Sequence, residues 1–379
     1  MSKKALVVSF SDLSRDPRVW KQLLFLTERG FEVTAVGEKD PQMEGVEFID
    51  CKTLPKNYRN RFGRVKRLGK ILTRRYESLY WSQPHNKQLL STLKDKTFDL
   101  LISNELESLP LVVKLKKSGK VYFDAHEYAP REFEDVLQWR LLIQPFRHYL
   151  CRTYLKEADF RTTVCQGIAE EYKKNFGSSF EILTNAAFYH DLSPKPVDEN
   201  CIKMIYHGCA TASRSCEEVL KIMDLLDERF VLDMVLVPGC PQYIQEFKQK
   251  AQHYKNIRFI DPVPMQEISK MCNQYDIGFF PLLPLNINYY FGLGNKTFEF
   301  IQARVAHAIS PLPEMGRVIR ENHLGVIAED FTPKAFASML NNLSSKQIWE
   351  MKMNNHQVAR QLSAEANFDK LNKIIGFSP

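Results

Sequence analysis

The sequence predicts an α/β protein built from two doubly wound domains. Short apolar or β-branched runs alternate with longer stretches of helical spacing over residues 5–165, and the pattern begins again after about residue 200. Such alternation is typical of parallel sheets with helices on both faces. The polar stretch SPKPVDEN, residues 193–200, contains two prolines and predicts a linker. We therefore expect domains over 1–195 and 200–355.

The elements of each domain follow from their spacing. In the helix expected over 18–30, leucines recur at helical intervals and Gly30 is a natural C-terminal stop. The last helical segment, 355–376, has no strand after it, so we expect 356–379 to pack back on the first domain. The expected strands are 5–10, 31–37, 99–103, 121–125 and 161–165, then 203–208, 231–239, 257–261, 277–281 and 305–310.

Composition favours a globular protein that remains inside the cell. The 379 residues are 44% hydrophobic and 26% charged, which is ordinary for a folded domain. None of the eight cysteines forms a C-x-x-C pair, and free thiols fit a reducing compartment. The basic N-terminus has only a short apolar run without a cleavage site, and no stretch reaches the length of a membrane span. We expect a cytoplasmic location.

The net charge of +7 comes from one segment. Residues 56–75 hold nine basic residues and no acidic ones, and the rest of the chain has 43 basic against 45 acidic residues. An apolar stripe with helical spacing runs through the segment and beyond it, while most basic residues lie off the stripe. The stripe is Phe62, Val65, Leu68, Leu72, Tyr76 and Leu79, and the basic residues beside it are Arg61, Arg64, Arg67 and Lys70.

A basic amphipathic helix with aromatic residues fits an anionic membrane surface. The alternative is a stripe packed on the protein core with a solvated basic face. No nucleic-acid-binding motif accompanies the segment, so we expect no nucleic acid as a partner. We therefore predict a peripheral location at the inner face of the membrane.

The segment GLGNKTFEFIQARVAHAISPLPEM, residues 292–315, is the most informative part of the second half. Glycines precede Asn295, and an apolar helical pattern starts at Phe298. A helix N-terminus presents N–H groups that suit a phosphate. Glu299 in the first turn could accept hydrogen bonds from ribose hydroxyls, or it could simply be a carboxylate favoured by the helix dipole. The G-x-x-x-x-G-K spacing of a P-loop is missing.

This segment resembles the donor-binding motif of glycosyltransferase family 4, which has the GT-B fold. Other motifs of one branch of that family occur in the same order along nearly the whole chain. The segments that carry the resemblance are SFSDLSRDPRV from Ser9, DLLISNELESLPL from Asp99, VYFDAHEY from Val121, ILTNAA from Ile182, IYHGCATASRS from Ile205 and GLGNKTFEF from Gly292.

The resemblance implies two Rossmann-like domains facing across a cleft, with the acceptor on the first and the nucleotide-sugar on the second. It implies a retaining transfer of a hexosyl or N-acetylhexosaminyl group in bacterial surface polysaccharide assembly, such as capsule or O-antigen. The expected donor is a nucleoside-diphosphate sugar, UDP-linked, and the expected acceptor is a glycan or a lipid-linked glycan. No separate cofactor is expected.

The expected donor-binding residues lie in the second domain. Arg214 and Lys296 are candidates for the diphosphate, because fixed cations stabilise charge on a leaving group. The alternatives are a surface loop charge for Arg214 and a solvated cap residue for Lys296. The resemblance adds Gly208, Asn295 and Thr297 to this set, and assigns Glu299 to the ribose.

The expected catalytic residues are His126 and Glu127, in the D-x-H-E turn after the strand 121–125. The resemblance implies that the His126 imidazole lies near the sugar and the leaving phosphate, where it can donate a hydrogen bond. Glu127 either belongs to the acceptor site or is a helix-start carboxylate.

Further candidates border the expected cleft on the acceptor side. The loop after the first strand holds Asp12, Arg15 and Arg18, and Asn104 follows the strand 99–103. Arg15 or Arg18 would meet an acceptor phosphate. The alternative is a local Asp–Arg pair that fixes the loop.

The sequence departs from the family pattern at two places. Phe291 stands where the family usually has a first glutamate, and Arg304 and Ala306 replace the glycine and proline of the following turn. The altered turn is expected to affect packing. No D-x-D pair is present to hold Mg²⁺ or Mn²⁺, so we expect no metal. Rival interpretations are a GT-B sugar-nucleotide epimerase and a non-catalytic partner subunit that kept the fold.

Overall fold

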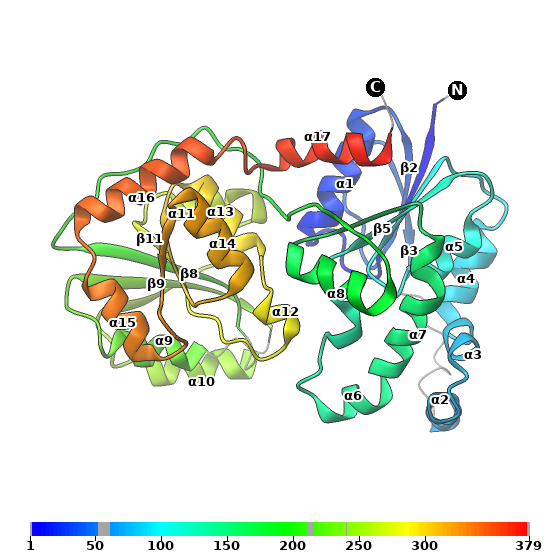
Figure 1. Cartoon of the computed structure of the whole chain (residues 1–379), viewed down its shortest axis with the longest axis horizontal. Coiled ribbons are helices and arrows are strands. Elements are labelled where there is room, and N and C mark those ends of the chain that lie inside the picture. The colour runs from blue at the N-terminus through cyan, green and yellow to red at the C-terminus, as the bar shows by residue number, and fades with distance from the viewer. Residues whose placement is uncertain (1, 52–60, 211–215, 240, 377–379) are drawn as a thin grey trace. The chain divides into compact units, whose positions relative to one another are not determined.

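The computed structural model describes residues 2–51, 61–210, 216–239 and 241–376, with only the backbone considered at Arg61, Phe62 and Pro238. The chain forms two compact units. Unit 1 comprises Met1–Thr184, Asn286–Asn288 and Lys370–Pro379, and unit 2 comprises Asn185–Leu285 and Tyr289–Asp369 (Figure 1). The division falls just before Asn185, ahead of the stretch 193–200 where the sequence predicts the linker.

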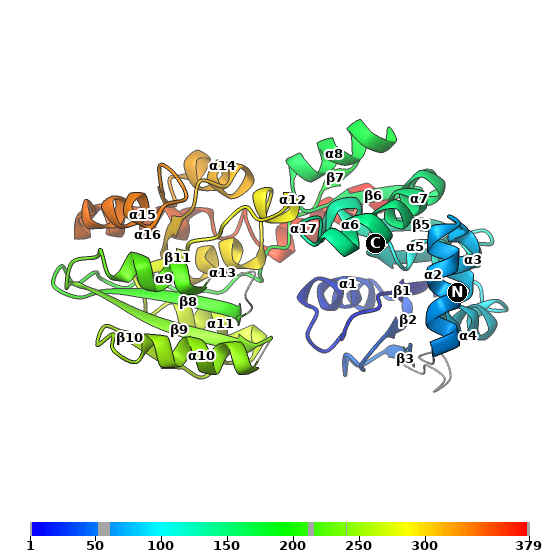
Figure 2. The same ribbon diagram turned by 90° about the horizontal axis from the view of Figure 1, so that it is seen from below.

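Unit 1 is built on a seven-stranded parallel sheet with helices on both faces (Figures 1 and 2). Its order is β3-β2-β1-β4-β5-β6-β7. β1 is buried from Ala5 to Val8, as expected for a central strand covered on both sides. The strands are β1 (Lys4–Val8), β2 (Glu32–Gly37), β3 (Val46–Asp50), β4 (Leu100–Asn104), β5 (Lys120–Ala125), β6 (Phe160–Thr163) and β7 (Glu181–Ile182).

The first helix of unit 1 shows how the sequence sets its bounds. Asp16 caps α1 (Pro17–Glu28) by accepting from the backbone N–H groups of Arg18 and Val19, and Pro17 suits the first helical position. The other helices are α2 (Arg61–Leu72), α3 (Tyr76–Trp81), α4 (Pro84–Leu93), α5 (Leu109–Leu115), η2 (Ala129–Arg131), α6 (Leu137–Leu142), α7 (Gln144–Tyr154), η3 (Leu155–Glu157) and α8 (Gln166–Phe176).

Unit 2 is built on a six-stranded parallel sheet of order β10-β9-β8-β11-β12-β13. The strands are β8 (Ile202–Ala210), β9 (Phe230–Pro238), β10 (Ile257–Ile260), β11 (Ile277–Phe280), β12 (Ala306–Ile309) and β13 (Gly325–Ile327). The helices are α9 (Cys216–Met223), α10 (Pro241–Ala251), η5 (Met265–Glu267), α11 (Ile268–Cys272), α13 (Asn295–Ala303), α14 (Pro313–Asn322), α15 (Pro333–Asn341) and α16 (Ser345–Val358). Two helices, α12 (Ile287–Tyr290) and α17 (Ala364–Ile375), have residues in both units.

Each sheet has one point where the strand order reverses. In unit 1, β1 lies between β2 and β4, and in unit 2, β8 lies between β9 and β11. In doubly wound sheets, ligands bind outside the carboxyl ends of the strands at this reversal. The topology therefore selects the ends of β1 and β4 in unit 1, and the ends of β8 and β11 in unit 2.

The C-terminal segment differs from the single helix expected over 355–376. α16 ends at Val358 and α17 begins at Ala364. Ser363 accounts for the new start, because its hydroxyl accepts from the N–H of Ala366. The last part of α17 groups with unit 1, where Asn372 accepts a hydrogen bond from Arg29 Nε at 2.7 Å.

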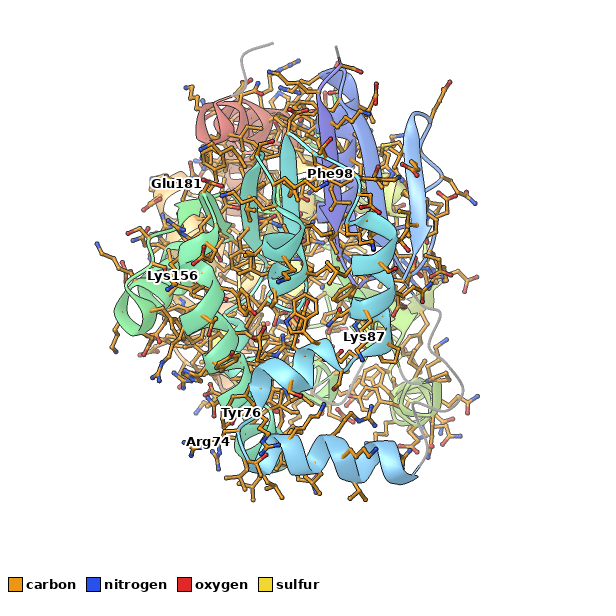
Figure 3. The ribbon with its side chains drawn as sticks, turned by 90° about the vertical axis from the view of Figure 1, so that its right-hand side faces the viewer. Arg74, Tyr76, Lys87, Phe98, Lys156 and Glu181 are labelled. Carbon is orange, nitrogen blue, oxygen red and sulfur yellow. The ribbon has the colours of Figure 1, made fainter. Side chains whose placement is uncertain are left out.

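The apolar stripe predicted as one continuous helical face is broken. α2 ends at Leu72, and Arg74 has a left-handed backbone, φ +54°, before α3 starts at Tyr76. Tyr76 and Leu79 are buried, and Tyr76 packs against the rings of α7, whereas Val65, Leu68 and Leu72 of α2 are exposed. Figure 3 shows α2 at one edge of unit 1, with Arg74 and Tyr76 labelled at its junction with α3.

Candidate functional site

The N-terminus of α13 lies in unit 2 and starts earlier than the sequence pattern suggests. α13 begins at Asn295, with Gly294 at the N-cap, so Glu299 is in the second turn and not in the first. A simple first-turn interaction with the helix dipole therefore does not explain Glu299. Because Gly294 has no side chain to cap the helix, the first-turn N–H groups are the natural anion-binding feature here.

Lys296 lies directly over the end of β8. A methyl group at Gly208 would come within 2.6 Å of Lys296 Nζ, and Gly208 has φ +139°, a region that L-residues rarely adopt. Lys296 Nζ also lies 5.0 Å from the centre of the Phe280 ring at the end of β11. The lysine is thus placed at the strand-order reversal of the unit 2 sheet, where a cation can meet a phosphate.

Replacing Gly208 by alanine is expected to lower the free energy of unfolding by about 1–3 kcal/mol, because the backbone is strained and Lys296 must move. Urea unfolding of the full chain measures this. Gly69→Ala in α2 is the control, since Gly69 has open space around it and helical alanine is favoured over glycine. Equal stability of Gly208→Ala and the wild type would show that Lys296 is not held at this position.

Glu299 is mostly buried and lies beside a histidine that the sequence analysis did not select. Glu299 Oε2 is 3.5 Å from His207 Nε2, and this buried nitrogen has no hydrogen-bond partner among the residues that the structure describes. Burial, together with the charge of Lys296, lowers the pKa of His207 to about 3. His207 is therefore neutral at physiological pH, and its Nε2 can orient the Glu299 carboxylate if it carries the ring proton.

Two other expected donor residues are fixed within unit 2. Thr297 is buried, its carbonyl lies 3.0 Å from His307 Nε2, and its hydroxyl has no partner within the described part of the chain. Asn295 accepts a hydrogen bond from Asn185, the residue of the ILTNAA motif. Thr297 thus faces the packed side of α13, while Asn295 joins the helix start to the start of unit 2.

The structure shows the contacts of Arg304 and Phe291, two residues that depart from the family pattern. Arg304 is fully buried, has φ +62°, and donates hydrogen bonds to the carbonyls of Ile301, Gln302 and His190. It therefore acts as a packing residue at the end of α13. Phe291 follows α12, and its ring lies 5.0 Å from that of Tyr290.

In unit 1, the loop after β1 is held by its own carboxylates. Asp12 accepts from Lys39 Nζ and from the Ser14 hydroxyl, both at 2.6 Å. These two hydrogen bonds are the largest factors that lower the pKa of Asp12. Asp16 caps α1, and Arg15 is exposed on the loop.

Arg18 does not form the local Asp–Arg pair considered from the sequence. Its Nε and Nη2 donate to the two carboxylate oxygens of Asp124 on β5, at 2.7 and 2.6 Å. The side chains of Arg18 and Asp124 are 5% and 0% exposed. Burial opposes ionisation of Asp124, but Arg18 outweighs it, so the pKa of Asp124 is lowered. Arg18 is thus a buried structural cation beneath the ends of β1 and β5.

A relay of side chains connects this pair to His126. Gln22 donates to Asp124 at 2.6 Å, Asn104 donates to Gln22 at 2.8 Å, and His126 Nε2 lies 3.0 Å from Asn104 Oδ1. The other ring nitrogen, Nδ1, is 3.1 Å from Glu105 Oε1. Both nitrogens of His126 therefore lie within hydrogen-bonding distance of unit 1 side chains.

Glu127 is exposed, and its carboxylate accepts from Asn288 Nδ2 at 3.2 Å. Two further acidic residues, Glu107 and Glu132, form ion pairs with Arg147. Burial raises the pKa of Glu132 to about 8, although Arg147 opposes the shift. This end of unit 1 therefore carries several acidic side chains.

Arg214 and the side chain of Arg61 lie outside the described residues. Within the described ranges, no three His, Cys, Asp or Glu side chains come close enough together to hold a metal ion. The two clusters also contain Gln22, Glu105 and His207, which the sequence pattern did not single out. Glu105 and His207 are sequence neighbours of Asn104 and Gly208, and that adjacency at strand ends is the signal that could have found them.

No known protein-family model matches the sequence, and no curated protein is detectably similar to it. Solved structures share its fold at low sequence identity. Sucrose-phosphate synthase from Thermosynechococcus elongatus has a TM-score of 0.74 at 13% identity, covering 98% of both chains. Anabaena HepE in complex with UDP and glucose has a TM-score of 0.72 at 11% identity, covering 99% of both.

WaaG, a glycosyltransferase involved in lipopolysaccharide biosynthesis, has a TM-score of 0.63 at 13% identity, covering 99% of this chain and all of its own. These structures are GT-B proteins. The prediction of an α/β GT-B fold with two doubly wound domains is therefore confirmed.

Proposed function

We propose that the chain is a glycosyltransferase of family 4 that moves a hexosyl or N-acetylhexosaminyl group from a UDP-linked sugar to a glycan or lipid-linked acceptor. The observation that carries this proposal is the cluster of Gly208, Lys296 and Glu299 at the strand-order reversal of unit 2. The bare backbone of Gly208 and the positive charge of Lys296 suit a diphosphate, and the Glu299 carboxylate suits a ribose.

The two units have separate roles in this proposal. Unit 2 binds the nucleotide-sugar, with Lys296 and the N-terminus of α13 on the diphosphate and Glu299 on the ribose. Unit 1 binds the acceptor near Glu127 and His126. The UDP complex of the HepE structure and the lipopolysaccharide role of WaaG support a sugar nucleotide and bacterial surface polysaccharide as the context.

A donor screen by thermal unfolding tests the proposal. Ligands that bind only the folded state raise its apparent stability. We expect at least one nucleotide-sugar, with UDP-sugars first, to raise the unfolding temperature, and the corresponding free sugar to have no effect. A screen in which no nucleotide or nucleotide-sugar shifts the transition would contradict the proposal.

Transfer is expected to survive EDTA. Lys296, the N-terminus of α13 and Arg214 would together stabilise the charge that a metal ion neutralises in other transferases. Initial rates measured with and without chelator test this, and we expect them to agree within about twofold. Removal of an essential charge-stabilising group would lower the rate far more. Complete loss of activity that Mg²⁺ or Mn²⁺ restores would contradict the proposed mechanism.

We also propose a peripheral membrane location, supported by the exposed apolar face of α2. Val65, Leu68 and Leu72 are 64%, 44% and 68% exposed, so these residues are not packed on the core. Arg64, Arg67 and Lys70 lie on the same helix. Exposed apolar groups beside cations fit an anionic membrane surface. No helix in the described part of the chain is long and apolar enough to span a bilayer.

A second exposed apolar group supports the same surface. α6 has no buried residue, and Leu137 and Leu141 are among its exposed side chains, with Arg140 beside them. Figures 1 and 2 agree in placing α6 at the same edge of unit 1 as α2. The proposed membrane surface therefore comprises α2 and α6.

The chain is expected to sediment with anionic but not neutral liposomes at low ionic strength. Each Lys or Arg near such a surface contributes about 1 kcal/mol. Changing Arg61, Arg64, Arg67 and Lys70 to glutamine should therefore abolish sedimentation while nucleotide binding is unchanged. The control changes Lys248, Lys250, Lys334 and Lys346, exposed lysines of unit 2, to glutamine.

Leu137→Ser together with Leu141→Ser is expected to weaken the same binding without changing its dependence on lipid charge. Wild-type protein that ignores anionic liposomes would contradict the membrane proposal. Equal losses in the α2 variant and in the unit 2 control would show that total charge matters and that α2 is not a specific contact.

A further inference from the structure

The relay at the ends of β4 and β5 fixes which atoms donate and which accept. The Asp124 carboxylate only accepts, so Gln22 turns its Nε2 toward it. Gln22 Oε1 then accepts from Asn104 Nδ2, which leaves Asn104 Oδ1 facing His126 Nε2 at 3.0 Å. An amide oxygen cannot donate, so a hydrogen bond here requires a proton on His126 Nε2.

The other nitrogen of His126 meets a carboxylate. Nδ1 is 3.1 Å from Glu105 Oε1, and an ionised carboxylate likewise accepts only. A ring that donates from both nitrogens is an imidazolium. In the alternative arrangement, the proton between Nδ1 and Glu105 belongs to Glu105, which then donates a hydrogen bond to a neutral ring.

The charges around His126 favour the imidazolium. The ring faces Glu105 at the end of β4, and its Nε2 lies 3.7 Å from Asp124 Oδ2 on β5. Arg18 of α1 also binds the Asp124 carboxylate. With a neutral ring, the two carboxylates would have only the Arg18 guanidinium as a positive partner. An imidazolium adds a second positive charge, so the group has no net charge. Burial favours the neutral ring, but Glu105 and Asp124 outweigh burial and Arg18, so the pKa of His126 is raised.

Glu105 is held in place by its backbone as well as by its side chain. Its φ is +66°, a left-handed conformation that costs a residue other than glycine about 1–2 kcal/mol. Its N–H donates to the carbonyl of Asp124 at 3.1 Å, and the hydroxyls of Ser103 and Ser108 donate to its carbonyl. Strained residues fixed by several contacts are concentrated at functional sites.

We infer that Glu105 is a positioning residue that holds His126 as an imidazolium, so that unit 1 presents a fixed positive charge at the carboxyl end of β5. Its functional consequence rests on the proposed transferase activity. Both ring nitrogens carry protons and are engaged, so His126 does not accept a proton from the acceptor hydroxyl. Its charge instead stabilises negative charge that develops on a group bound at this end of unit 1.

Nitrogen NMR of the full, ¹⁵N-histidine-labelled chain without ligands tests this inference directly. The His126 signals are identified by their loss in His126→Asn. At pH 7.5 we expect both ring nitrogens to have the chemical shifts of an imidazolium, and a titration midpoint above the value of about 6.5 for unperturbed histidine. Glu105→Gln keeps the shape of the side chain but removes its charge, and should lower the midpoint by about 1–3 pH units.

Two further variants separate charge from structure. Glu107→Gln removes a nearby carboxylate that pairs with Arg147, and should leave the midpoint unchanged. Glu105→Asp keeps the charge and should restore part of the shift that Glu105→Gln removes. A neutral His126 ring in the wild type at pH 7.5, or a midpoint that Glu105→Gln does not change, would overturn the inference. Because no donor or acceptor is present, this result is independent of whether the proposed transfer occurs.

Discussion

Replacing Glu299 by alanine is expected to weaken donor binding by roughly 10- to 150-fold. A hydrogen bond to a charged group contributes about 1.5–3 kcal/mol, and the proposed ribose contact is of this kind. Glu299 is mostly buried beside His207, so its carboxylate is already oriented before the donor arrives. Isothermal titration calorimetry with the best donor from the thermal screen measures the change.

The matched control is Glu321→Ala in the same unit. Glu321 is an exposed glutamate of α14, and its removal should leave donor affinity unchanged. Urea unfolding of both variants separates lost binding from lost structure. An unchanged dissociation constant in Glu299→Ala would show that Glu299 does not contact the donor. Lys296 would then be the only member of the pair left as a donor-binding candidate.

Replacing Arg18 by methionine is expected to lower the free energy of unfolding by about 3–5 kcal/mol at pH 7. The change leaves the Asp124 carboxylate buried without its bidentate partner, and a buried charge that loses its partner is strongly destabilising. Arg15→Met is the control, because Arg15 is exposed on the preceding loop and should change stability by less than about 0.5 kcal/mol.

The pH dependence of this loss has a definite sign. Arg18 lowers the pKa of Asp124 in the folded wild type, so the stability it provides is present above the unfolded value of about 3.9 and is lost as pH falls through the folded pKa. In Arg18→Met, burial acts alone and Asp124 binds a proton more readily. The difference between the two proteins should therefore shrink as pH falls below about 5. A difference that grows on acidification would contradict the buried ion pair.

The central strands were predictable because their apolar runs are long and continuous. β1, β5 and β8 are buried on both faces, and their sequences show no competing pattern. β3, β7 and β13 were not predicted, and all three are edge strands. β7 and β13 have only two and three residues, and β3 has no buried residue, so none leaves a periodic signal.

The candidate site was predictable where a residue lies in a motif at a strand end, as for His126 and Gly208. It was not predictable where the partner is distant in sequence. Arg18 and Asp124 are joined across 106 positions, and only the sheet order brings α1 beside β5. The contacts of both His126 nitrogens depend on the side-chain amides of Gln22 and Asn104, and no rule of sequence spacing predicts them.

The proposed function depends on sugar transfer itself. The most direct measurement incubates the chain with the donor that stabilises it and a bacterial glycolipid extract, then follows nucleoside diphosphate release and the acceptor by mass spectrometry. We predict diphosphate release that requires the extract, with a lipid-linked glycan heavier by one sugar. Conversion of the donor to an epimeric nucleotide-sugar without acceptor, or donor binding without turnover in any acceptor mixture, would contradict the assignment as a glycosyltransferase.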